Sequence, residues 1–315
     1  KSKIYIAGHN GLVGSAIVRK LKQKGYNNLI LRSKKKLDLK NQKKVYNFLK
    51  RNKPDFIFIA AAKVGGIYSN DKYRAEFIFD NLSIQANLIH SAYLCGIKNL
   101  IFLGSSCVYP RNCKQPIKES YLLTGELEKT NDAYAVAKIA GIKMCESYNR
   151  QYGVDYRCIM PTNLYGPGDH YHDENSHVIP GLINRFHKGK INKLTKIIIW
   201  GSGKPKREFL YVDDLAKASI HLMNVDKKNY NELTSPMSSH INIGSNIEIT
   251  ISELAKVIKK IVGFKGMIDY DFTKPDGTQR KLLNIKKMES LGFKPKITLK
   301  DGLINTYQDY KKKLA

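Results

Sequence analysis

The chain has 315 residues, which exceeds one average domain, and its 42% hydrophobic content is ample for a large buried core. Intrinsic disorder is therefore excluded. A formal net charge of +27 raises the question of a nucleic-acid partner. However, the lysines are spread along the whole chain, and no zinc-finger, RNP-like or basic-zipper pattern accompanies them. We therefore expect a solvated basic surface and no nucleic-acid partner.

The apolar runs of the sequence argue against a membrane protein. The longest, such as 56–62 and 100–103, are far too short to cross a bilayer, and strand-like residues begin at Ile4 with no apolar signal region before them. The five cysteines are odd in number and have no paired metal spacing, which indicates reduced thiols and no metal site. We therefore expect a cytoplasmic protein without membrane contact.

In the first half of the chain, short β-rich runs alternate with amphipathic helical segments. This alternation predicts a doubly wound, mainly parallel α/β sheet of the Rossmann type, covered by helices on both faces. We expect this domain to fill residues 1–165. Its predicted strands are 3–7, 28–31, 56–59 and 100–103, and the predicted helices include 15–24 and 42–51.

After about residue 165 the alternation becomes irregular, and a loop rich in His, Asp, Asn and Gly spans residues 166–176. We expect residues 166–315 to form mainly a smaller C-terminal lobe, with some segments returning to the main sheet. The predicted strands there are 196–200 and 240–244, and the predicted helices include 212–223 and 251–261.

A glycine-rich loop joins the first predicted strand to the first predicted helix, with Gly8, Gly11 and Gly14 at its key positions. Glycine allows a tight turn, close approach of the backbone to a pyrophosphate, and close packing of the helix on the strand. The helix N-terminus adds free N–H groups and a favourable dipole. In this strand-to-helix context the loop predicts dinucleotide binding.

The residues after the second predicted strand indicate which dinucleotide binds. An NAD enzyme usually places a carboxylate there to hold the ribose 2′-hydroxyl. Here Leu31 is followed by Arg32, Ser33 and three lysines that begin at Lys34. Cations at this place favour a 2′-phosphate and hence NADP, although Asp38 lies nearby and could blur the choice.

Tyr134 and Lys138 form a candidate catalytic pair. They lie one turn apart on one face of a predicted helix, so that an ammonium is next to a phenol. We expect the cation to lower the pKa of Tyr134 and prepare it to donate a proton to a carbonyl being reduced. The same spacing occurs elsewhere, but only this copy has small residues around it and a hydroxyl, Ser105, at an upstream strand end. Ser105 is suited to bond the substrate oxygen beside Tyr134.

Seven segments carry a more specific signal: IAGHNGLVGSA (6–16), AAAKVGG (60–66), LGSSCVYP (103–110), YAVAKIAG (134–141), MPTNLYGP (160–167), NSHVIP (175–180) and KPDG (274–277). Together they resemble the GDP-L-fucose synthases, a family of bifunctional epimerase-reductases within the extended short-chain dehydrogenases/reductases. The resemblance covers nearly the whole chain. It implies a Rossmann domain, a substrate-binding lobe, NADPH as cofactor, a GDP-sugar as substrate, and a homodimer formed through helices that include the one bearing Tyr134.

The resemblance implies that Ser105, Tyr134 and Lys138 serve a reduction, and that Cys107 and His177 exchange protons with the sugar during epimerisation. Inverting carbons 3 and 5 of a 4-keto sugar needs a base on one face and an acid that reprotonates the other. A thiol and an imidazole both titrate near neutrality. The pattern of residues alone would make Cys107 a small buried hydrophobe and His177 a loop histidine. The implied reaction converts GDP-4-keto-6-deoxy-D-mannose to GDP-L-fucose.

Binding residues are also implied by the resemblance. Arginines suit a diphosphate, because the planar guanidinium bonds two oxygens at once. Asn10 is a departure, since some relatives have an arginine there that is expected to face the 2′-phosphate. The implied substrate residues are Arg185, Trp200, Arg207, Asp276 and Lys281. The implied cofactor residues are Gly8, His9, Asn10, Gly11, Leu12, Val13, Gly14, Lys34, Leu103, Gly104, Ser105, Ser106, Lys138, Pro161, Thr162, Asn163, Leu164 and His177.

Four other functions are weighed against this one. A nucleotide-sugar 4,6-dehydratase should carry acidic residues just after the strand-end hydroxyl, where this chain has Ser106 and Cys107. A 4-ketoreductase of a related GDP-4-keto sugar, such as a deoxyheptose, would retain all of these motifs and have little or no epimerase activity. A non-catalytic NADP sensor or a nucleic-acid-binding protein would have no need for the intact set of Ser105, Tyr134 and Lys138.

Overall fold

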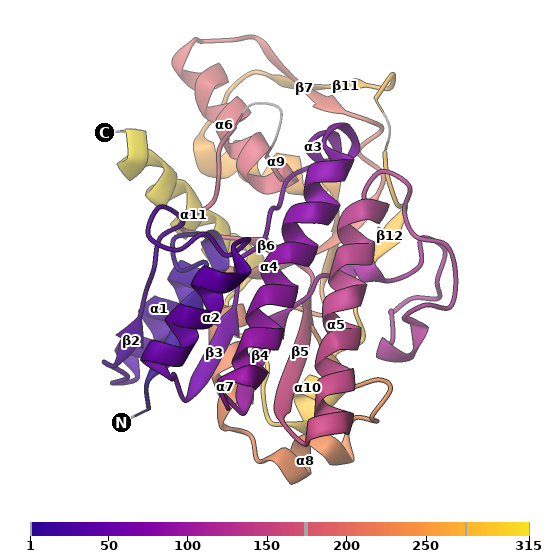
Figure 1. The fold of residues 1–315 in the computed structure, drawn as a ribbon. Helices are drawn as coiled ribbons and strands as arrows, with labels where there is room; N and C mark the ends of the chain where they lie inside the picture. The colour runs from indigo at the N-terminus through magenta and orange to yellow at the C-terminus, as the bar shows by residue number, and fades with distance from the viewer. Residues whose placement is uncertain (1, 173–175, 275, 315) are drawn as a thin grey trace.

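The computed structural model describes residues 2–172, 176–274 and 276–314, which leaves part of the predicted loop 166–176 and of the segments 175–180 and 274–277 outside the described residues. A six-stranded parallel sheet forms the centre of the larger lobe (Figure 1). This sheet confirms the predicted fold class. Its strands, in spatial order, are β2 (Leu29–Ile30), β1 (Ile4–Ala7), β3 (Phe56–Ile59), β4 (Asn99–Leu103), β5 (Asp155–Pro161) and β9 (His240–Ile243).

The central strands are short apolar runs. β1 is buried at every residue, and β3 and β4 are buried except at their first residue. Such continuous apolar runs are typical of parallel sheets, because helices cover both faces and neither face meets water. The four strands predicted in the first half are confirmed to within one residue at each end.

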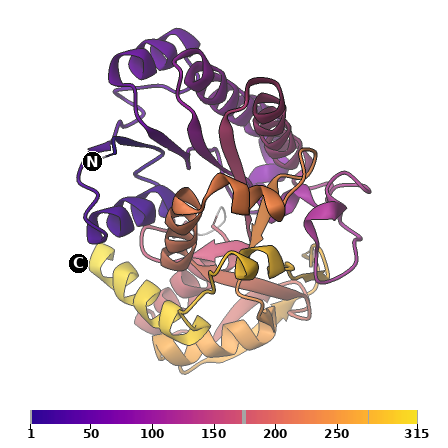
Figure 2. The ribbon, with the colours of Figure 1, turned by 90° about the horizontal axis from the view of Figure 1, so that it is seen from below.

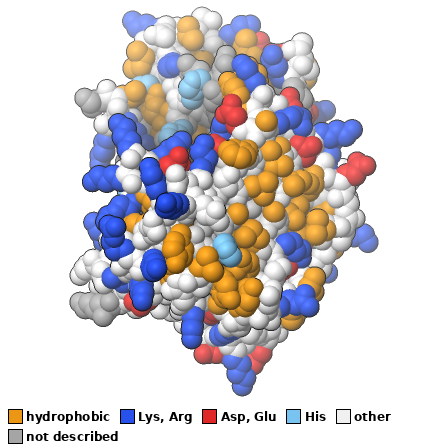
Figure 3. Space-filling view, in the orientation of Figure 1, with side chains coloured by type: hydrophobic (Ala, Val, Ile, Leu, Met, Phe, Trp, Pro, Cys, Tyr) orange, Lys and Arg blue, Asp and Glu red, His pale blue; other side chains and the backbone are white. Residues whose placement is uncertain are grey.

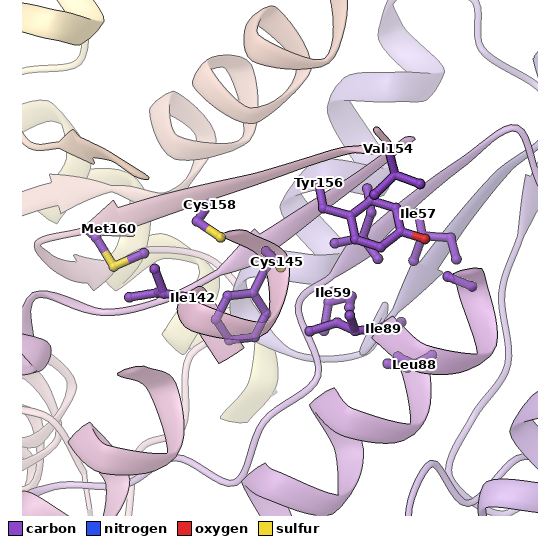
Figure 4. Packing of buried hydrophobic residues seen from close by; sticks show 14 of the residues in the cluster. Ile57, Ile59, Leu88, Ile89, Ile142, Cys145, Val154, Tyr156, Cys158 and Met160 are labelled. Atoms are coloured by element: carbon purple, nitrogen blue, oxygen red, sulfur yellow. The ribbon is translucent and has the colours of Figure 1, made fainter. Parts of the chain in front are cut away.

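Helices cover both faces of the sheet, as Figure 2 shows. One layer contains α2 (Gln42–Asn52), α4 (Arg74–Leu94) and α5 (Asp132–Tyr152), and the other contains α1 (Leu12–Gln23) and α7 (Val212–Asn224). An apolar cluster seals each layer against the sheet. Figure 4 shows part of the first cluster, in which the following side chains pack together: Ile57, Ile59, Leu88, Ile89, Ile142, Cys145, Val154, Tyr156, Cys158 and Met160.

The smaller lobe has its own apolar cluster, drawn from residues 165–310. In it, β8 pairs with β6, β10 and β12, while β7 and β11 form a separate parallel pair at the top of Figure 1. Its elements are β6 (Asn163–Tyr165), α6 (Val178–Ile191), β7 (Lys196–Trp200), β8 (Lys206–Tyr211), β10 (Glu248–Thr250), α9 (Ile251–Val262), β11 (Met267–Asp271), β12 (Arg280–Lys281) and α11 (Leu299–Leu314). Short helices complete the described chain: α3 (Ile67–Lys72), η1 (Ser106–Val108), η2 (Glu119–Tyr121), α8 (Lys227–Glu232) and α10 (Lys286–Ser290).

Two segments from the second half of the chain return to the main sheet. β9 pairs in parallel with β5 and forms the last strand of the sheet. α7 packs against α1, where Arg19 and Lys20 each form an ion pair of 2.7 Å with Asp213 at the start of α7. β9 and α7 therefore belong to the main sheet and its helical layer, although they come from the second half of the chain.

Glu208 of β8 connects the two lobes. Its side chain is fully buried, and its carboxylate accepts the N–H groups of Asn246 at 2.7 Å and Leu283 at 3.0 Å. Its backbone carbonyl accepts the side chains of Thr162 at 3.2 Å and Asn163 at 2.9 Å, just after β5. Burial raises the pKa of Glu208, and the hydrogen bonds act in the opposite direction. One buried residue therefore fixes separate chain segments near the carboxyl end of β5.

All five cysteines are free thiols, as predicted. Cys145 and Cys158 are buried, whereas Cys95, Cys107 and Cys113 are partly exposed. Across the part of the chain that the structure describes, no helix combines the length and apolarity that crossing a bilayer requires.

Candidate active site

The glycine-rich loop lies where the strand order of the main sheet reverses. β2 is on one side of β1 and β3 is on the other, so a crevice opens at the carboxyl end of β1. Gly8 follows β1 with a φ of +84°, and a Cβ there would lie 2.6 Å from the backbone nitrogen of Ala61. A Cβ at Gly14 would overlap the carbonyl oxygen of Gly8. Both positions therefore require glycine, one for the turn and one for the packing of α1 against it.

The start of α1 fits the pyrophosphate of a dinucleotide. Gly11 is the N-cap residue and has no side chain to cap the first N–H groups of the helix. These groups and the helix dipole favour an anion. Nδ1 of His9 is buried and has no hydrogen-bond partner among the described residues, and burial lowers the pKa of this imidazole. Asn10 is exposed, and the side chains of Leu12 and Val13 pack on the apolar cluster below the loop.

The cations predicted to face a 2′-phosphate lie just beyond β2. Lys34 is exposed in a turn that is closed by the bond from the Leu37 N–H to the Ser33 carbonyl, 2.9 Å. Arg32 lies over the ring of Phe48, 5.8 Å from its centroid. Because β1 and β2 are parallel, this turn and the glycine-rich loop are at the same edge of the sheet.

Ser105 lies where β4 ends and η1 begins. Its hydroxyl accepts the N–H of Cys107 at 3.3 Å and so caps η1. The preceding Gly104 donates its N–H to the carbonyl of Ile159 at 2.9 Å, and a Cβ on Gly104 would overlap the side chain of Met160. This close contact between β4 and β5 fixes where Leu103 ends the strand and where Ser105 emerges.

Lys138 ties α5 to the end of β4. Its side chain is 3% exposed, and its Nζ donates to the carbonyl oxygen of Leu103 at 2.8 Å. The same Nζ lies 4.8 Å from the ring centroid of Phe102 and 5.8 Å from that of Tyr134. Burial lowers the pKa of Lys138 to about 7. Gly141, one turn further along α5, allows this approach, because a Cβ there would overlap Phe102.

The prediction that Lys138 lowers the pKa of Tyr134 is wrong. Burial raises the pKa of Tyr134 well above its usual value, and the charge of Cys107 adds to the rise. A hydrogen bond with the Ser105 hydroxyl lowers it by less. Lys138 gives its hydrogen bond to Leu103 and loses much of its own charge through burial, so desolvation dominates. Tyr134 is therefore held as a neutral phenol, which is the form that can donate a proton.

Cys107 is surrounded by hydrogen-bond donors. Nδ2 of Asn131 lies 3.5 Å from its Sγ, and Nζ of Lys281 lies 3.7 Å from the same atom. The sequence prediction placed Lys281 with the substrate residues and missed Asn131. The available signal was its place three residues before Tyr134, at the start of α5.

The predicted substrate residues fall into two neighbouring groups on the smaller lobe. Arg207 and Lys281 are partners in the parallel pairing of β8 with β12, and Arg207 is close enough to Cys107 to feel its charge. Arg207 also donates to the backbone carbonyl of Asp276, 3.4 Å. In the second group, the guanidinium of Arg185 lies 5.2 Å from the ring centroid of Trp200, which is 44% exposed.

Asp276 has a structural partner that the sequence did not reveal. Its two carboxylate oxygens accept the backbone N–H and the hydroxyl of Ser202, each at 2.7 Å. Ser202 lies in the turn between β7 and β8, two residues after Trp200. Asp276 therefore fixes the turn that carries Trp200.

The remaining predicted residues lie at the carboxyl end of β5 and at the start of α6. Pro161 ends β5, Thr162 and Asn163 donate to Glu208, and Leu164 pairs in β6. His177 is the N-cap residue of α6. Reduced hydration lowers its pKa, and repulsion from His170 adds a smaller effect. The structure thus brings Ser105, Cys107, Tyr134 and Lys138 into one contact network. His177 accepts the N–H of Gly181 through its backbone carbonyl at 3.0 Å and lies near His170, and both of these residues belong to the smaller lobe.

A cavity adjoins Cys107 on the side facing the smaller lobe. We call it the Cys107 cavity. The residues that line the cavity are Cys107, Tyr109, Pro110, Arg111, Gln115, Ile117, Glu128, Thr278, Arg280 and Lys281.

Within the described ranges, no cluster of three or more His, Cys, Asp or Glu residues could hold a metal ion.

A sequence model of the NAD dependent epimerase/dehydratase family matches residues 4–244. The chain belongs to this family. It is 52% identical to the GDP-L-fucose synthase of Escherichia coli (strain K12) over 308 residues, which cover 98% of this chain and 96% of that protein. It is 53% identical to GDP-L-fucose synthase 1 of Arabidopsis thaliana over 314 residues, which cover 100% of this chain and 94% of that protein. These relatives confirm the resemblance predicted from the seven segments.

A solved structure extends the comparison to the fold. The GDP-mannoheptose C4 reductase from Campylobacter jejuni with NADP bound is 41% identical, with a TM-score of 0.88. The match covers 99% of this chain and 98% of that one. The described fold is therefore shared with this solved relative over nearly the whole length of both chains.

The packing of the glycine-rich loop predicts that Gly14→Ala is destabilising. The added Cβ would overlap the Gly8 carbonyl oxygen, and overpacking of this kind costs about 1–3 kcal/mol of the free energy of unfolding. Gly11→Ala is the matched control, because its Cβ would lie at an ordinary 3.5 Å from the same oxygen. Thermal unfolding of cofactor-free protein, followed by circular dichroism, should show a lower midpoint for Gly14→Ala only. Equal midpoints for the two variants would contradict this packing.

The burial of Lys138 predicts a pH-dependent effect of Lys138→Met. The folded-state pKa of about 7 lies below the usual 10.5, so the folded protein binds fewer protons than the unfolded chain between these values. The cost of burying Lys138 is therefore greatest below pH 7 and vanishes as the pH approaches 10.5. The stability gained by Lys138→Met should fall by roughly 1.4 kcal/mol for each pH unit above 7. Urea unfolding of both proteins from pH 6 to 10 measures this slope, and a constant difference would rule it out.

Proposed function

We propose that this protein converts GDP-4-keto-6-deoxy-D-mannose to GDP-L-fucose by 3,5-epimerisation and NADPH-dependent 4-reduction. The observation that carries the proposal is the position of a thiol, Cys107, in the same network as Ser105, Tyr134 and Lys138. A ketoreductase needs only the last three. The relatives named GDP-L-fucose synthase, at 52% and 53% identity over nearly the whole chain, support the same reaction.

In this proposal NADP binds at the carboxyl end of the main sheet. The start of α1 receives the pyrophosphate, because its N–H groups lack a side-chain cap and the glycines leave room for the backbone to approach it. Lys34 and Arg32 at the end of β2 attract the 2′-phosphate. A solved relative with NADP bound, 41% identical to this chain, supports this choice of cofactor.

For the reduction, bound NADPH supplies a hydride to carbon 4 of the sugar. Tyr134 donates the proton that the carbonyl oxygen takes up, and burial keeps the phenol protonated until that moment. Ser105 donates a hydrogen bond to the same oxygen. Lys138 stands beneath the ring and, when protonated, stabilises the phenolate that remains.

For the epimerisation, Cys107 and His177 act as base and acid at carbons 3 and 5. The thiolate removes the proton next to the 4-keto group. The electron pair of the C–H bond forms a carbon–carbon double bond, and the π pair of the carbonyl moves onto the keto oxygen to give an enolate. Ser105 and Tyr134 stabilise this oxygen by hydrogen bonds. His177 returns a proton to the opposite face of the carbon.

The smaller lobe binds the GDP-sugar in this proposal. Arg207 and Lys281 lie side by side next to Cys107 and are suited to the diphosphate. Arg185 and Trp200 form the neighbouring part of the site. Asp276 contributes by holding the turn that carries Trp200, through its hydrogen bonds with Ser202.

A second candidate is a 4-ketoreductase of a related GDP-4-keto sugar, such as a deoxyheptose, with little or no epimerase activity. The observation in its favour is the 41% identity and TM-score of 0.88 to a GDP-mannoheptose C4 reductase. Such an enzyme would use Ser105, Tyr134 and Lys138 in the same way, and Cys107 would have no proton to remove.

Hydrogen exchange separates the two functions. With GDP-4-keto-6-deoxy-D-mannose in deuterated water and no NADPH, the epimerase should introduce deuterium at carbons 3 and 5, which NMR detects. Cys107→Ser should reduce this exchange by about 10²–10⁴-fold, because the alcohol is a much weaker base. The same variant should lose far less of its rate with a pre-epimerised substrate and NADPH. No exchange in the wild-type protein would favour the ketoreductase, and equal loss of both activities would refute the separate role of Cys107.

We also propose that the protein is a homodimer formed through α4 and α5, the helix that bears Tyr134. Figure 3 shows an apolar patch over these two helices. Several of its large apolar side chains are exposed to solvent in the single chain, which an interface would cover. They are Phe79, Leu94, Val136 and Tyr152, at 63%, 53%, 44% and 43% exposure.

The double variant Phe79→Glu/Leu94→Glu should be monomeric in sedimentation velocity, because two charges on this patch cannot be buried without partners. Ile191→Glu is the matched control: Ile191 is 64% exposed at the end of α6, away from α4 and α5, and its variant should remain dimeric. A wild-type protein that sediments as a monomer would overturn the proposed dimer.

A further inference from the structure

The side chain of Asn131 has an unusual position for a residue at the start of a helix. Asn131 is the N-cap residue of α5, where asparagine normally accepts a hydrogen bond from the N–H two or three residues later. Its side chain makes no such bond. Instead, Nδ2 points to Sγ of Cys107 at 3.5 Å. The stabilisation available from capping is forgone, and the amide is directed to the thiol of the neighbouring η1.

A second donor approaches the same sulfur from the smaller lobe. Nζ of Lys281 lies 3.7 Å from Sγ of Cys107, across 174 residues of sequence. β12 holds Lys281 beside Arg207 of β8, whose guanidinium also interacts with the charge of Cys107. The sulfur is therefore placed between one amide donor and two cationic side chains, which come from both lobes.

The other charged groups around Cys107 do not cancel this field. In the Cys107 cavity, Glu128 is paired with Arg111 at 3.1 Å, and Arg280 is paired with Glu248 at 2.7 Å. Burial keeps the phenols of Tyr109 and Tyr134 neutral. Because Glu128 is already paired with Arg111, the charged groups that remain near the sulfur are Lys281 and Arg207, and both are cationic.

The amide of Asn131 can also serve the protonated thiol. Its Oδ1 is buried and has no hydrogen-bond partner among the described residues. A half-turn of the amide about its terminal torsion exchanges Oδ1 with Nδ2, so that Oδ1 accepts from the S–H. Asn131 can therefore donate from Nδ2 to the unprotonated sulfur and accept at Oδ1 from the protonated one.

We propose that Asn131 and Lys281 are positioning residues for Cys107, which hold its sulfur as a thiolate aimed into the site. The consequence for epimerisation rests on the proposed function: the thiolate takes the carbon-bound proton and becomes S–H, the C–H electron pair forms a carbon–carbon double bond, and the carbonyl π pair moves to the keto oxygen. Asn131 then turns to accept that S–H, and the reverse turn accompanies proton loss. Lys281 belongs to β12, so the smaller lobe contributes to the surroundings of the sulfur in this step.

The pH dependence of alkylation of Cys107 tests the proposal without any sugar substrate. Iodoacetamide reacts with the thiolate, and mass spectrometry of the peptide bearing Cys107 distinguishes it from the other cysteines. At pH 7, Asn131→Ala should react roughly tenfold more slowly than the wild type, because one hydrogen bond to an anion is lost. Asn131→Asp, which keeps the shape of the side chain, should react more slowly still, because it places a carboxylate beside the sulfur. Lys281→Met should also react more slowly. All variants should approach the wild-type rate near pH 10.

Asn41→Ala is the matched control. Asn41 is the N-cap residue of α2 and does cap its helix, with Oδ1 accepting the N–H of Lys44 at 2.9 Å. Its loss removes an N-cap asparagine without touching Cys107, so the alkylation profile should match the wild type. Profiles for Asn131→Ala and Asn131→Asp that coincide with the wild type would overturn the proposal. That outcome is distinct from failure of the proposed function, which is an absence of deuterium exchange in the wild-type protein.

The deuterium exchange provides a second readout. If Asn131 acts through the thiolate, Asn131→Ala should lower exchange at carbons 3 and 5 roughly tenfold at pH 7, and raising the pH to 9 should restore most of it. A loss that stays the same at both pH values would show that Asn131 only supports the fold around α5, and would count against the proposal.

Discussion

The hydrogen bond from Lys138 to the carbonyl of Leu103 is the interaction on which the rest of the site depends. It joins the helix α5 to the end of β4 at 2.8 Å, with the ammonium almost completely buried. Because Gly141 lets α5 lie close against Phe102, the phenol of Tyr134 reaches the hydroxyl of Ser105 at the strand end. The same junction leads into η1 and so places the thiol of Cys107. A buried lysine is costly to keep, and its retention here is explained by the geometry that it imposes on its neighbours.

The smaller lobe completes this site rather than merely covering it. Its buried residue Glu208 bonds segments that follow β5, β9 and β12, so that the carboxyl edge of the main sheet and the small sheet are held together. β12 then delivers Lys281 to within 3.7 Å of the sulfur of Cys107. Ser105, Tyr134 and Lys138 thus belong to the first lobe, while the charged and polar side chains around the Cys107 thiol come from both lobes.

The secondary structure and the glycine-rich loop could be predicted from the sequence. The contacts between residues far apart in the chain could not. Apolar runs and the glycine spacing were sufficient for the strands, for the loop after β1 and for the helix that carries Tyr134, because these depend on nearby residues. The contact of Lys281 with Cys107 joins residues 174 positions apart, and nothing in either segment encodes it. Asn131 was missed because an asparagine at this position is expected to cap its own helix. Its side chain instead donates to Cys107, which the sequence does not reveal. The pKa of Tyr134 was predicted in the wrong direction, because the spacing revealed the neighbouring cation but not the depth of burial. The roles of His177 and of the substrate residues remain predictions from family resemblance.

The central claim is that one site performs both proton exchange and reduction. The most direct measurement is the complete reaction of GDP-4-keto-6-deoxy-D-mannose with NADPH, followed by NADPH oxidation, with the sugar product identified by NMR. The account predicts GDP-L-fucose, in which carbons 3 and 5 are inverted and carbon 4 is reduced. A product reduced at carbon 4 with carbons 3 and 5 unchanged would contradict it and would establish a ketoreductase instead.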